Sequence, residues 1–169
     1  MITDFNAIGR DLNWQTVNDT VMGGVSSSRI QNTVEGFVRF SGTLSLENNG
    51  GFTSMRSNGS LPDLSDCDSL VIRAKGDGRT YQLRVRTGSG WRTPNYSATF
   101  ATTKGKWQEH RLPLDNFVPG WRGRTLRGIP PINPSKIQSL SIFLGDKKPG
   151  TFNLLVDWIK ASAGRPARS

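Results

Sequence analysis

Tryptophan and arginine side chains that lie close together are the groups in this sequence best suited to bind a partner. Residues 115–134 form a long segment with four prolines and little hydrophobic periodicity, and such a segment in a small domain is usually functional or mobile. Its central part contains Trp121, Arg122, Arg124 and Arg127. Trp and Arg are enriched among the residues that dominate binding energy at protein interfaces. They also stack on bases and sugar rings, so the cluster predicts a binding site without fixing the partner's chemistry.

A second set of basic residues alternates with apolar residues in two predicted strands, 70–75 and 81–86. The turn Gly76-Asp77-Gly78 between them is typical of a β-hairpin. We therefore expect their basic residues to share one outward face, where like charges are unfavourable. An acidic partner, or carboxylates from another element, would offset this cost; an ordinary solvated face is the alternative. The set comprises Arg73, Lys75, Arg79, Arg84, Arg86 and Arg92, with Trp91 next to the last.

Groups that could catalyse a reaction are scarce. The single histidine, His110, has the same strand parity as Leu112 and Leu114, so we expect it to point inward and to be hydrogen-bonded rather than to act as a base. The segment Gly88-Ser89-Gly90 lacks the spacing of a nucleophile elbow. The sequence therefore predicts a protein that is not an enzyme and that uses no cofactor.

Three aspartates in one short segment, Asp63, Asp66 and Asp68, could supply oxygen ligands to Ca²⁺. Aspartates also gather in turns because their side chains accept hydrogen bonds from nearby backbone N–H groups. No Glu follows at a fixed spacing, so we favour the turn and predict no metal site.

Two segments rich in glycine and asparagine are predicted to be mainly architectural. Adjacent glycines supply positive φ or allow another backbone to approach closely, and no lysine with strand-to-helix context follows them, which excludes a phosphate-binding loop. We expect both segments to form tight turns and to pack together at one end of the domain. Their residues are Asn18, Asp19, Gly23, Gly24, Asn48, Asn49, Gly50 and Gly51.

Hydrophobic residues repeat with a period of two along most of the chain. Many short strands with frequent turns indicate an all-β antiparallel sandwich or barrel. Helical spacing is nearly absent: residues 4–12 could form a short turn near the N-terminus, and residues 134–137 suggest one helical turn before a strand. We expect one domain over residues 1–160 and a basic, disordered tail over residues 161–169.

The composition limits the compartment and the partners. The chain has 169 residues, with 22 Lys and Arg against 13 Asp and Glu, a net charge of +9, which favours acidic partners. Its single cysteine, Cys67, excludes an internal disulfide framework. We see no secretory or transit segment and no apolar run of the roughly 20 residues that span a bilayer. The expected location is cytoplasmic, with peripheral attachment to a membrane left open.

Five stretches resemble the complex I intermediate-associated protein 30 family. They are Trp14 with VNDTVMGGVS (17–26), FSGTLSLENNGGF (40–52) followed by Arg56, the segment 81–86, WQEHRLPLDNFVPGWRGR (107–124) and FNLLVDWI (152–159). The resemblance implies a galactose-binding-like jelly-roll β-sandwich. It also implies a role in assembling a multi-subunit membrane complex, respiratory or photosynthetic, and it brings no catalytic residues.

Together these observations predict a non-enzymatic assembly factor that binds an acidic protein subunit or assembly intermediate. Trp121, Arg122 and Arg124 would be the anchor, and Arg84 and Arg86 would attract the partner electrostatically. The alternative is a carbohydrate-binding module that uses Trp91, Trp121 and Asn95. A nucleic-acid partner has no support beyond net charge, and we do not expect one.

Overall fold

The computed structural model describes residues 3–4, 13–58, 61, 63–88, 93–121 and 124–163. Regular structure in these ranges is almost entirely β. The strands are β1 (Thr3–Asp4), β2 (Asn13–Asn18), β3 (Ser27–Asn32), β4 (Val38–Leu44), β5 (Thr53–Asn58), β6 (Cys67–Lys75), β7 (Thr80–Arg86), β8 (Asn95–Ala101), β9 (Trp107–Pro113), β10 (Val118–Trp121), β11 (Arg124–Thr125), β12 (Ser139–Leu144) and β13 (Gly150–Ala163). Short 3-10 helices cover Asp19–Met22, Glu47–Asn49, Leu114–Asn116 and Pro134–Lys136, the last at the predicted helical turn.

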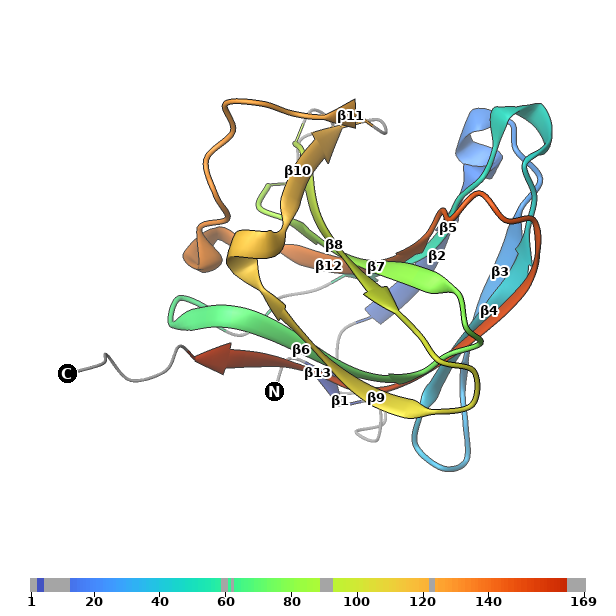
Figure 1. Cartoon of the computed structure of the whole chain (residues 1–169), viewed down its shortest axis with the longest axis horizontal. Helices are drawn as coiled ribbons and strands as arrows, with labels where there is room; N and C mark the ends of the chain where they lie inside the picture. The colour runs from blue at the N-terminus through green and yellow to red at the C-terminus, as the bar shows by residue number, and fades with distance from the viewer. Residues whose placement is uncertain are drawn as a thin grey trace.

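The strands form two antiparallel sheets that face each other (Figure 1). Sheet A has the order β3-β4-β13-β6-β9, with β1 paired to β13, and sheet B has the order β11-β10-β8-β7-β12-β5-β2. Sheet B curves away from sheet A at both ends, where β10 and β11 rise on one side and β5 and β2 on the other. The predicted antiparallel β-sandwich is confirmed.

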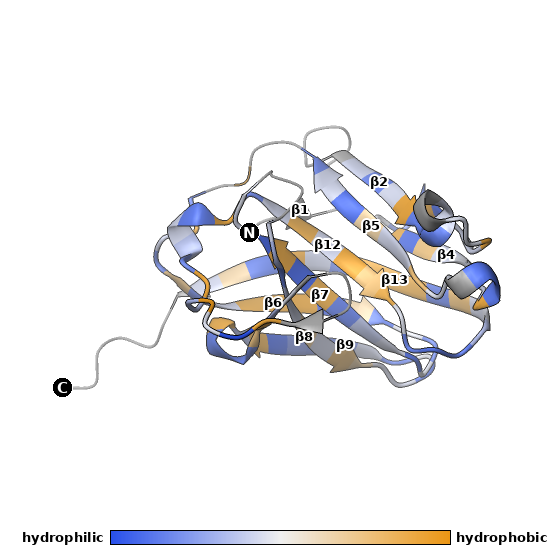
Figure 2. Cartoon of the chain, turned by 90° about the horizontal axis from the view of Figure 1, so that it is seen from above, coloured by the Kyte–Doolittle hydropathy of each residue, from blue (hydrophilic) through white to orange (hydrophobic). Residues whose placement is uncertain are grey.

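The core lies between the sheets and is built from alternate residues of each strand. Hydrophobic residues gather on the central strands of both sheets (Figure 2). Fully buried side chains come from sheet A (Phe40, Ile72, Leu154) and from sheet B (Tyr81, Leu83, Ile142). Because side chains of a strand alternate between its two faces, the other residues of β7 and β12 must lie on the outer face of sheet B.

The predicted hairpin over residues 70–86 is wrong. β6 pairs with β13 and β9, whereas β7 pairs with β8 and β12. Residues 76–79 therefore carry the chain from sheet A to sheet B, and Arg73 lies on a different sheet from Arg84 and Arg86. β8 likewise does not pair with the strand that follows it in the chain, since β9 belongs to sheet A.

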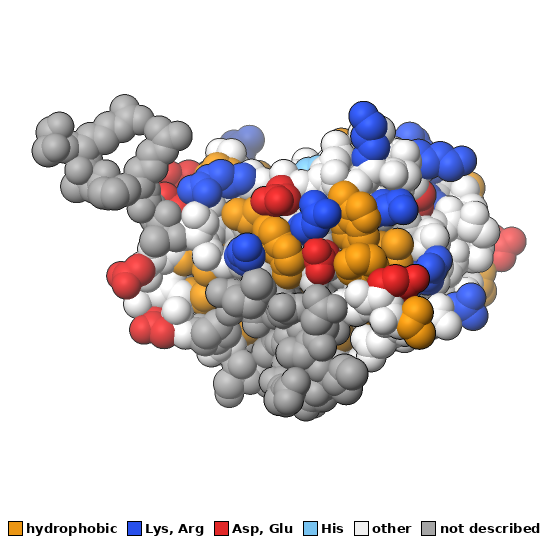
Figure 3. All heavy atoms as spheres, turned by 90° about the horizontal axis from the view of Figure 1, so that it is seen from below, with side chains coloured by type: hydrophobic (Ala, Val, Ile, Leu, Met, Phe, Trp, Pro, Cys, Tyr) orange, Lys and Arg blue, Asp and Glu red, His pale blue; other side chains and the backbone are white. Residues whose placement is uncertain are grey.

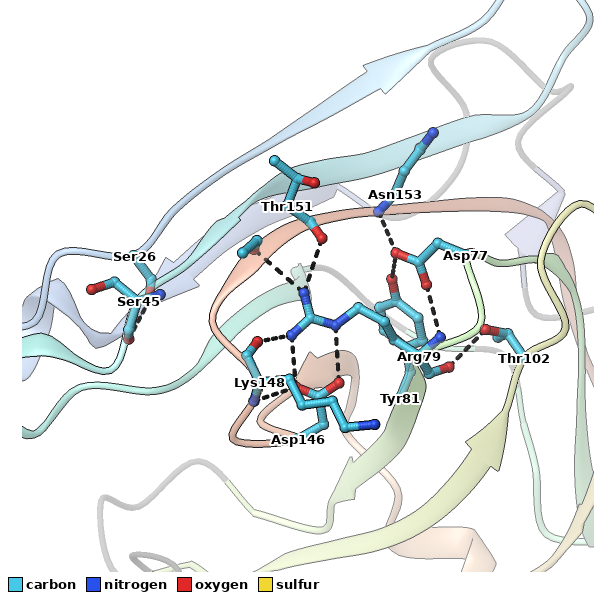
Figure 4. A network of polar contacts seen from close by, with 11 residues as sticks. Ser26, Ser45, Asp77, Arg79, Tyr81, Thr102, Asp146, Lys148, Thr151 and Asn153 are labelled. Carbon is cyan, nitrogen blue, oxygen red and sulfur yellow. Dashed lines mark hydrogen bonds and ion pairs between the residues drawn. The ribbon is translucent and has the colours of Figure 1, made fainter.

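A polar network holds this crossover in place (Figure 4). The guanidinium of Arg79 binds both carboxylate oxygens of Asp146, at 2.9 and 2.8 Å, and also the carbonyls of Lys148 and Thr151. Asp77 accepts hydrogen bonds from the Tyr81 hydroxyl at 3.0 Å and from the backbone N–H of Asn153 at 2.7 Å. Arg79 thus ties the β6–β7 crossover to the β12–β13 crossover and does not belong to a shared basic face.

Two other expectations need correction. The segment 115–134 is not wholly irregular, because β10 pairs with β8 and with β11. The predicted tail begins too early, since β13 pairs with β6 as far as Ala163; residues 164–169 lie outside the described residues.

Candidate functional site

The two glycine-rich segments meet at the carboxylate of Asp19, which is completely buried. Its Oδ1 accepts a hydrogen bond from the Ser26 backbone N–H at 2.9 Å. Its Oδ2 accepts from the Ser26 hydroxyl at 2.6 Å, the Gly51 N–H at 2.7 Å and the Phe52 N–H at 3.4 Å. Burial raises the pKa of Asp19, but the hydrogen bonds from Ser26, Gly51 and Phe52 outweigh it, so the net pKa is lowered.

The glycines around Asp19 serve two different needs. Gly23 adopts φ 87°, a left-handed conformation, whereas Gly24 and Gly50 are needed for space. A Cβ atom on Gly24 would lie 2.5 Å from Cγ of Asp19, and one on Gly50 would lie 2.4 Å from its Oδ2. Asn48 adds a hydrogen bond from its Nδ2 to the Gly23 carbonyl at 3.2 Å.

Asn18 joins the same end of the domain. Its Oδ1 accepts hydrogen bonds from the hydroxyls of Ser28, at 2.6 Å, and Thr53. The side chain of Asn49 lies outside the described residues. Hydrogen bonds between these segments thus connect the ends of β2, β3 and β5.

The outer face of sheet B carries the clearest functional feature. The seven strands of this sheet contain no Asp or Glu, yet they contain Arg56, Arg84, Arg86 and Arg124. Arg84 and Arg86 are on β7 and Arg56 is on β5, and β12 lies between the two strands. Ser141 of β12 is aligned with Arg84 on one side and with Arg56 on the other. Aligned residues of antiparallel strands project from the same face, so these three arginines share the outer face.

Burial and the charge of a neighbouring arginine disfavour the charged forms of Arg84 and Arg56. Burial, followed by the charge of Arg56, lowers the pKa of Arg84 to about 10. Burial, followed by the charge of Arg86, lowers the pKa of Arg56. Within the described chain, neither Arg56 nor Arg84 forms an ion pair with a carboxylate. The surface is therefore electropositive and suited to an anionic group.

The outer face of sheet A is different, because its charges are mixed. Arg73 binds Asp157 at 3.1 Å and lies over the ring of Trp107, and Arg111 lies 3.5 Å from Asp68. Figure 3 shows the molecule from the side of sheet A, where basic side chains lie among acidic and hydrophobic ones. Arg73 and Arg111 thus already have carboxylates from the same chain.

The predicted anchor is only partly visible. β10 places the backbone of Trp121 on sheet B, paired with Arg124 of β11, but both side chains lie outside the described residues, as do Arg122, Trp91 and Arg92. Arg127 is exposed in the loop after β11. The structure places Arg84 and Arg86 together on the outer face and adds Arg56, which was not among the residues predicted to bind a partner. The feature that points to Arg56 is that none of the strands of sheet B contains an acidic residue.

His110 and Asp63 take structural positions. His110 packs against the Phe100 ring of the opposite sheet, with 5.1 Å between ring centroids, and burial lowers its pKa. It points inward as predicted, but its Nε2 is buried and has no hydrogen-bond partner among the described residues. Asp63 accepts a hydrogen bond from the Ser65 N–H at 3.0 Å, as expected for a turn. The described residues contain no cluster of three or more metal-ligating side chains and no helix with the length and apolar character to cross a membrane.

Known structures share this fold. A family 11 carbohydrate-binding module of a cellulosomal cellulase of Clostridium thermocellum superposes with a TM-score of 0.66 at 17% identity, covering 97% of this chain and 95% of that one. An exo-β-agarase superposes with a TM-score of 0.61 at 14% identity, covering 98% of this chain and 26% of the enzyme. Likeness at this level of identity supports the jelly-roll fold and leaves function open.

Sequence comparison is more specific. The mitochondrial complex I intermediate-associated protein 30 of Mus musculus is 32% identical over 101 residues, which cover 57% of this chain and 31% of that protein. The match thus spans about a third of that relative's length. The sequence model of the family described as complex I intermediate-associated protein 30 (CIA30) matches residues 3–156. The chain belongs to the complex I intermediate-associated protein 30 family.

Proposed function

We propose that the chain is a non-enzymatic assembly factor that binds an acidic protein subunit, or an assembly intermediate, of a multi-subunit membrane complex. The observation that carries this proposal is the outer face of sheet B, where arginines from β5 and β7 lie on a sheet without a single carboxylate in its strands. Carboxylates of a partner would supply counter-charges to Arg56 and Arg84, which form no ion pair within the described chain. Family membership supports an assembly role.

The partner would contact an extended part of sheet B. β10 lies beside β8, which lies beside β7, so the backbone of Trp121 is on the same sheet as Arg84 and Arg86. We propose that Trp121, Arg122 and Arg124 anchor the partner while Arg56, Arg84 and Arg86 bind its carboxylates. Because the client belongs to a membrane complex, the chain would act at the membrane surface.

A capture experiment tests this function. The tagged chain is incubated at low salt with membrane and soluble fractions of the source cell, and bound proteins are identified by mass spectrometry. We expect stoichiometric subunits of one membrane complex, released by salt because the attraction is electrostatic. Salt-insensitive capture, or full binding by the Trp121→Ala, Arg122→Ala double variant, would contradict the proposal.

A pair of triple variants separates local recognition from net charge. Arg56→Gln, Arg84→Gln, Arg86→Gln removes three charges from sheet B, whereas Arg29→Gln, Arg39→Gln, Lys160→Gln removes three from sheet A. We expect the first to bind the client about tenfold more weakly or worse and the second to stay near wild type. Equal losses would show that only the overall charge matters.

A further inference from the structure

Arg84 is held in a fixed position on the outer face of sheet B. Its Nε donates a hydrogen bond to Oε1 of Gln82 at 2.9 Å, and its guanidinium carbon lies 3.5 Å from the centroid of the Phe143 ring. Phe143 in turn stacks on Phe52, with 5.5 Å between centroids and 16° between planes. A guanidinium fixed in this way loses little entropy when it binds a ligand.

Arg56 reaches the same place from the other side of β12. Ser141, aligned with both arginines, is only 7% exposed although it projects from the outer face. Two strand spacings of about 4.8 Å separate the backbones of Arg56 and Arg84. The two long side chains can therefore bring their guanidinium groups close together above β12. Nε of Arg56 is buried and has no hydrogen-bond partner among the described residues.

A buried guanidinium nitrogen without an acceptor is unfavourable, and a second positive charge nearby adds to the cost. Burial and then the charge of Arg56 lower the pKa of Arg84, which is consistent with this proximity. An oxyanion between the two groups would accept the unused hydrogen bonds and cancel the repulsion. Guanidinium forks match the geometry of oxyanions with two or more oxygens.

We propose that Arg56 and Arg84 form a subsite that binds a single oxyanion above Ser141, and that in the complex this oxyanion is a side-chain carboxylate of the acidic partner. The subsite rests on the proposed function for the identity of its ligand. The neighbouring Phe143–Phe52 stack offers an apolar surface to the methylene groups of the Asp or Glu that carries the carboxylate.

Small anions test the subsite without the client. The melting temperature of the purified chain is measured in acetate, glutarate, phosphate and chloride at equal ionic strength. We expect 100 mM glutarate to raise it by about 3 °C relative to chloride, as for a site with a dissociation constant of about 10 mM. The Arg56 Nε–H resonance should shift with glutarate and saturate at the same concentrations.

Variants assign the effect to the two arginines. Arg56→Gln and Arg84→Gln should each abolish the glutarate effect. Arg56→Gln should not lower the melting temperature in chloride, because it removes a repulsive charge, whereas Arg84→Gln also loses the contacts of Arg84 with Gln82 and Phe143. Arg56→Lys keeps the positive charge but loses the paired N–H donors of the guanidinium group. This variant should therefore lose most of the stabilisation by glutarate. Arg29→Gln, on sheet A, should respond like wild type.

Equal melting temperatures in glutarate and chloride, or a glutarate effect that persists in both glutamine variants, would overturn the subsite. Stabilisation by phosphate alone would overturn a carboxylate ligand and indicate a phosphate-bearing partner. The anion effect and client capture are independent readings. A glutarate effect with no captured client supports the subsite and counts against the assembly role. Capture of a client with no glutarate effect supports the assembly role and counts against the subsite.

Discussion

At the scale of single residues, Asp19 is the group on which the glycine-rich end of the domain depends. Its two oxygens accept hydrogen bonds from Ser26, Gly51 and Phe52, which lie far apart in the sequence. Asp19→Asn would place an NH₂ group against backbone donors and remove the charge. We expect unfolding free energy to fall by about 3 kcal/mol, measured by urea denaturation. Asp115→Asn, at an exposed turn, should change it little.

The same carboxylate predicts a pH dependence. Because the folded pKa of Asp19 lies below its ordinary value of 3.8, its contribution to stability is complete above that value and is lost as the pH falls through the folded pKa. We therefore expect wild type to lose more unfolding free energy between pH 6 and pH 2 than Asp19→Asn does. The variant should retain some acid sensitivity, since the Asp146 pKa is also lowered. Parallel pH profiles for the two proteins would be inconsistent with this role.

Neighbouring glycines should respond differently to the same substitution. Gly23 has φ 87°, and in the described part of the chain no atom beyond its two chain neighbours lies within 4 Å of the place that a Cβ would take. Gly23→Ala should therefore cost only backbone strain, about 1 kcal/mol. Gly24→Ala must displace the hydrogen-bonded Asp19 side chain, and we expect a loss of about 3 kcal/mol. Chemical denaturation of the two variants shows which loses more unfolding free energy. A larger loss for Gly23→Ala would refute the close packing of Gly24 against Asp19.

At the scale of elements, the crossovers between sheets depend on Arg79. The side chains of Arg79 and Asp146 are 12% and 10% exposed, so the pair is largely buried. Arg79→Ala leaves Asp146 without its counter-charge, and we expect a loss of about 3–5 kcal/mol. The exposed Arg111–Asp68 pair supplies the control: Arg111→Ala should cost less than about 1 kcal/mol. Thermal or urea unfolding measures the loss of unfolding free energy in both variants. Similar losses would show that Arg79 does not stabilise the crossovers more than an exposed ion pair does.

Strand positions could be predicted from the sequence, but strand partners could not. Alternation in 70–75 and 81–86 located β6 and β7, since each buries one face. The turn Gly76-Asp77-Gly78 fits a hairpin and a crossover equally well, and the choice is made by contacts with distant strands: β7 pairs with β12, and β6 with β13. Local pattern carries no information about such pairing.

The candidate site was predictable to a similar degree. Arg84 and Arg86 stand out because they alternate with buried residues on β7. Arg56 does not, because β5 reads TSMRSN and buries residues on both faces, so no alternation marks its arginine. Its approach to Arg84 depends on β12 lying between β5 and β7, a neighbourhood that only the folded sheet creates.

At the scale of the whole molecule, the fold is shared with carbohydrate-binding modules while the described surface differs from a sugar platform. Phe143 lies on the outer face of sheet B, but Arg84 lies over its ring and Phe52 stacks on it as well. In the described part of this face, the ring is thus already covered by side chains of the same chain. A neutral sugar also offers no charge to the half-buried guanidiniums, which would lose hydration without gaining a counter-ion.

We therefore expect a neutral β-glucan tetrasaccharide to give no saturable heat in isothermal titration calorimetry and no change in melting temperature, under conditions in which glutarate stabilises the chain. The contrast is informative because it uses one protein preparation and two ligand chemistries. Saturable sugar binding that is lost in Trp91→Ala or Trp121→Ala would favour the carbohydrate-binding alternative. Binding that survives both substitutions but is lost in Arg84→Gln would instead place the sugar on the arginine face and contradict the requirement for an anion.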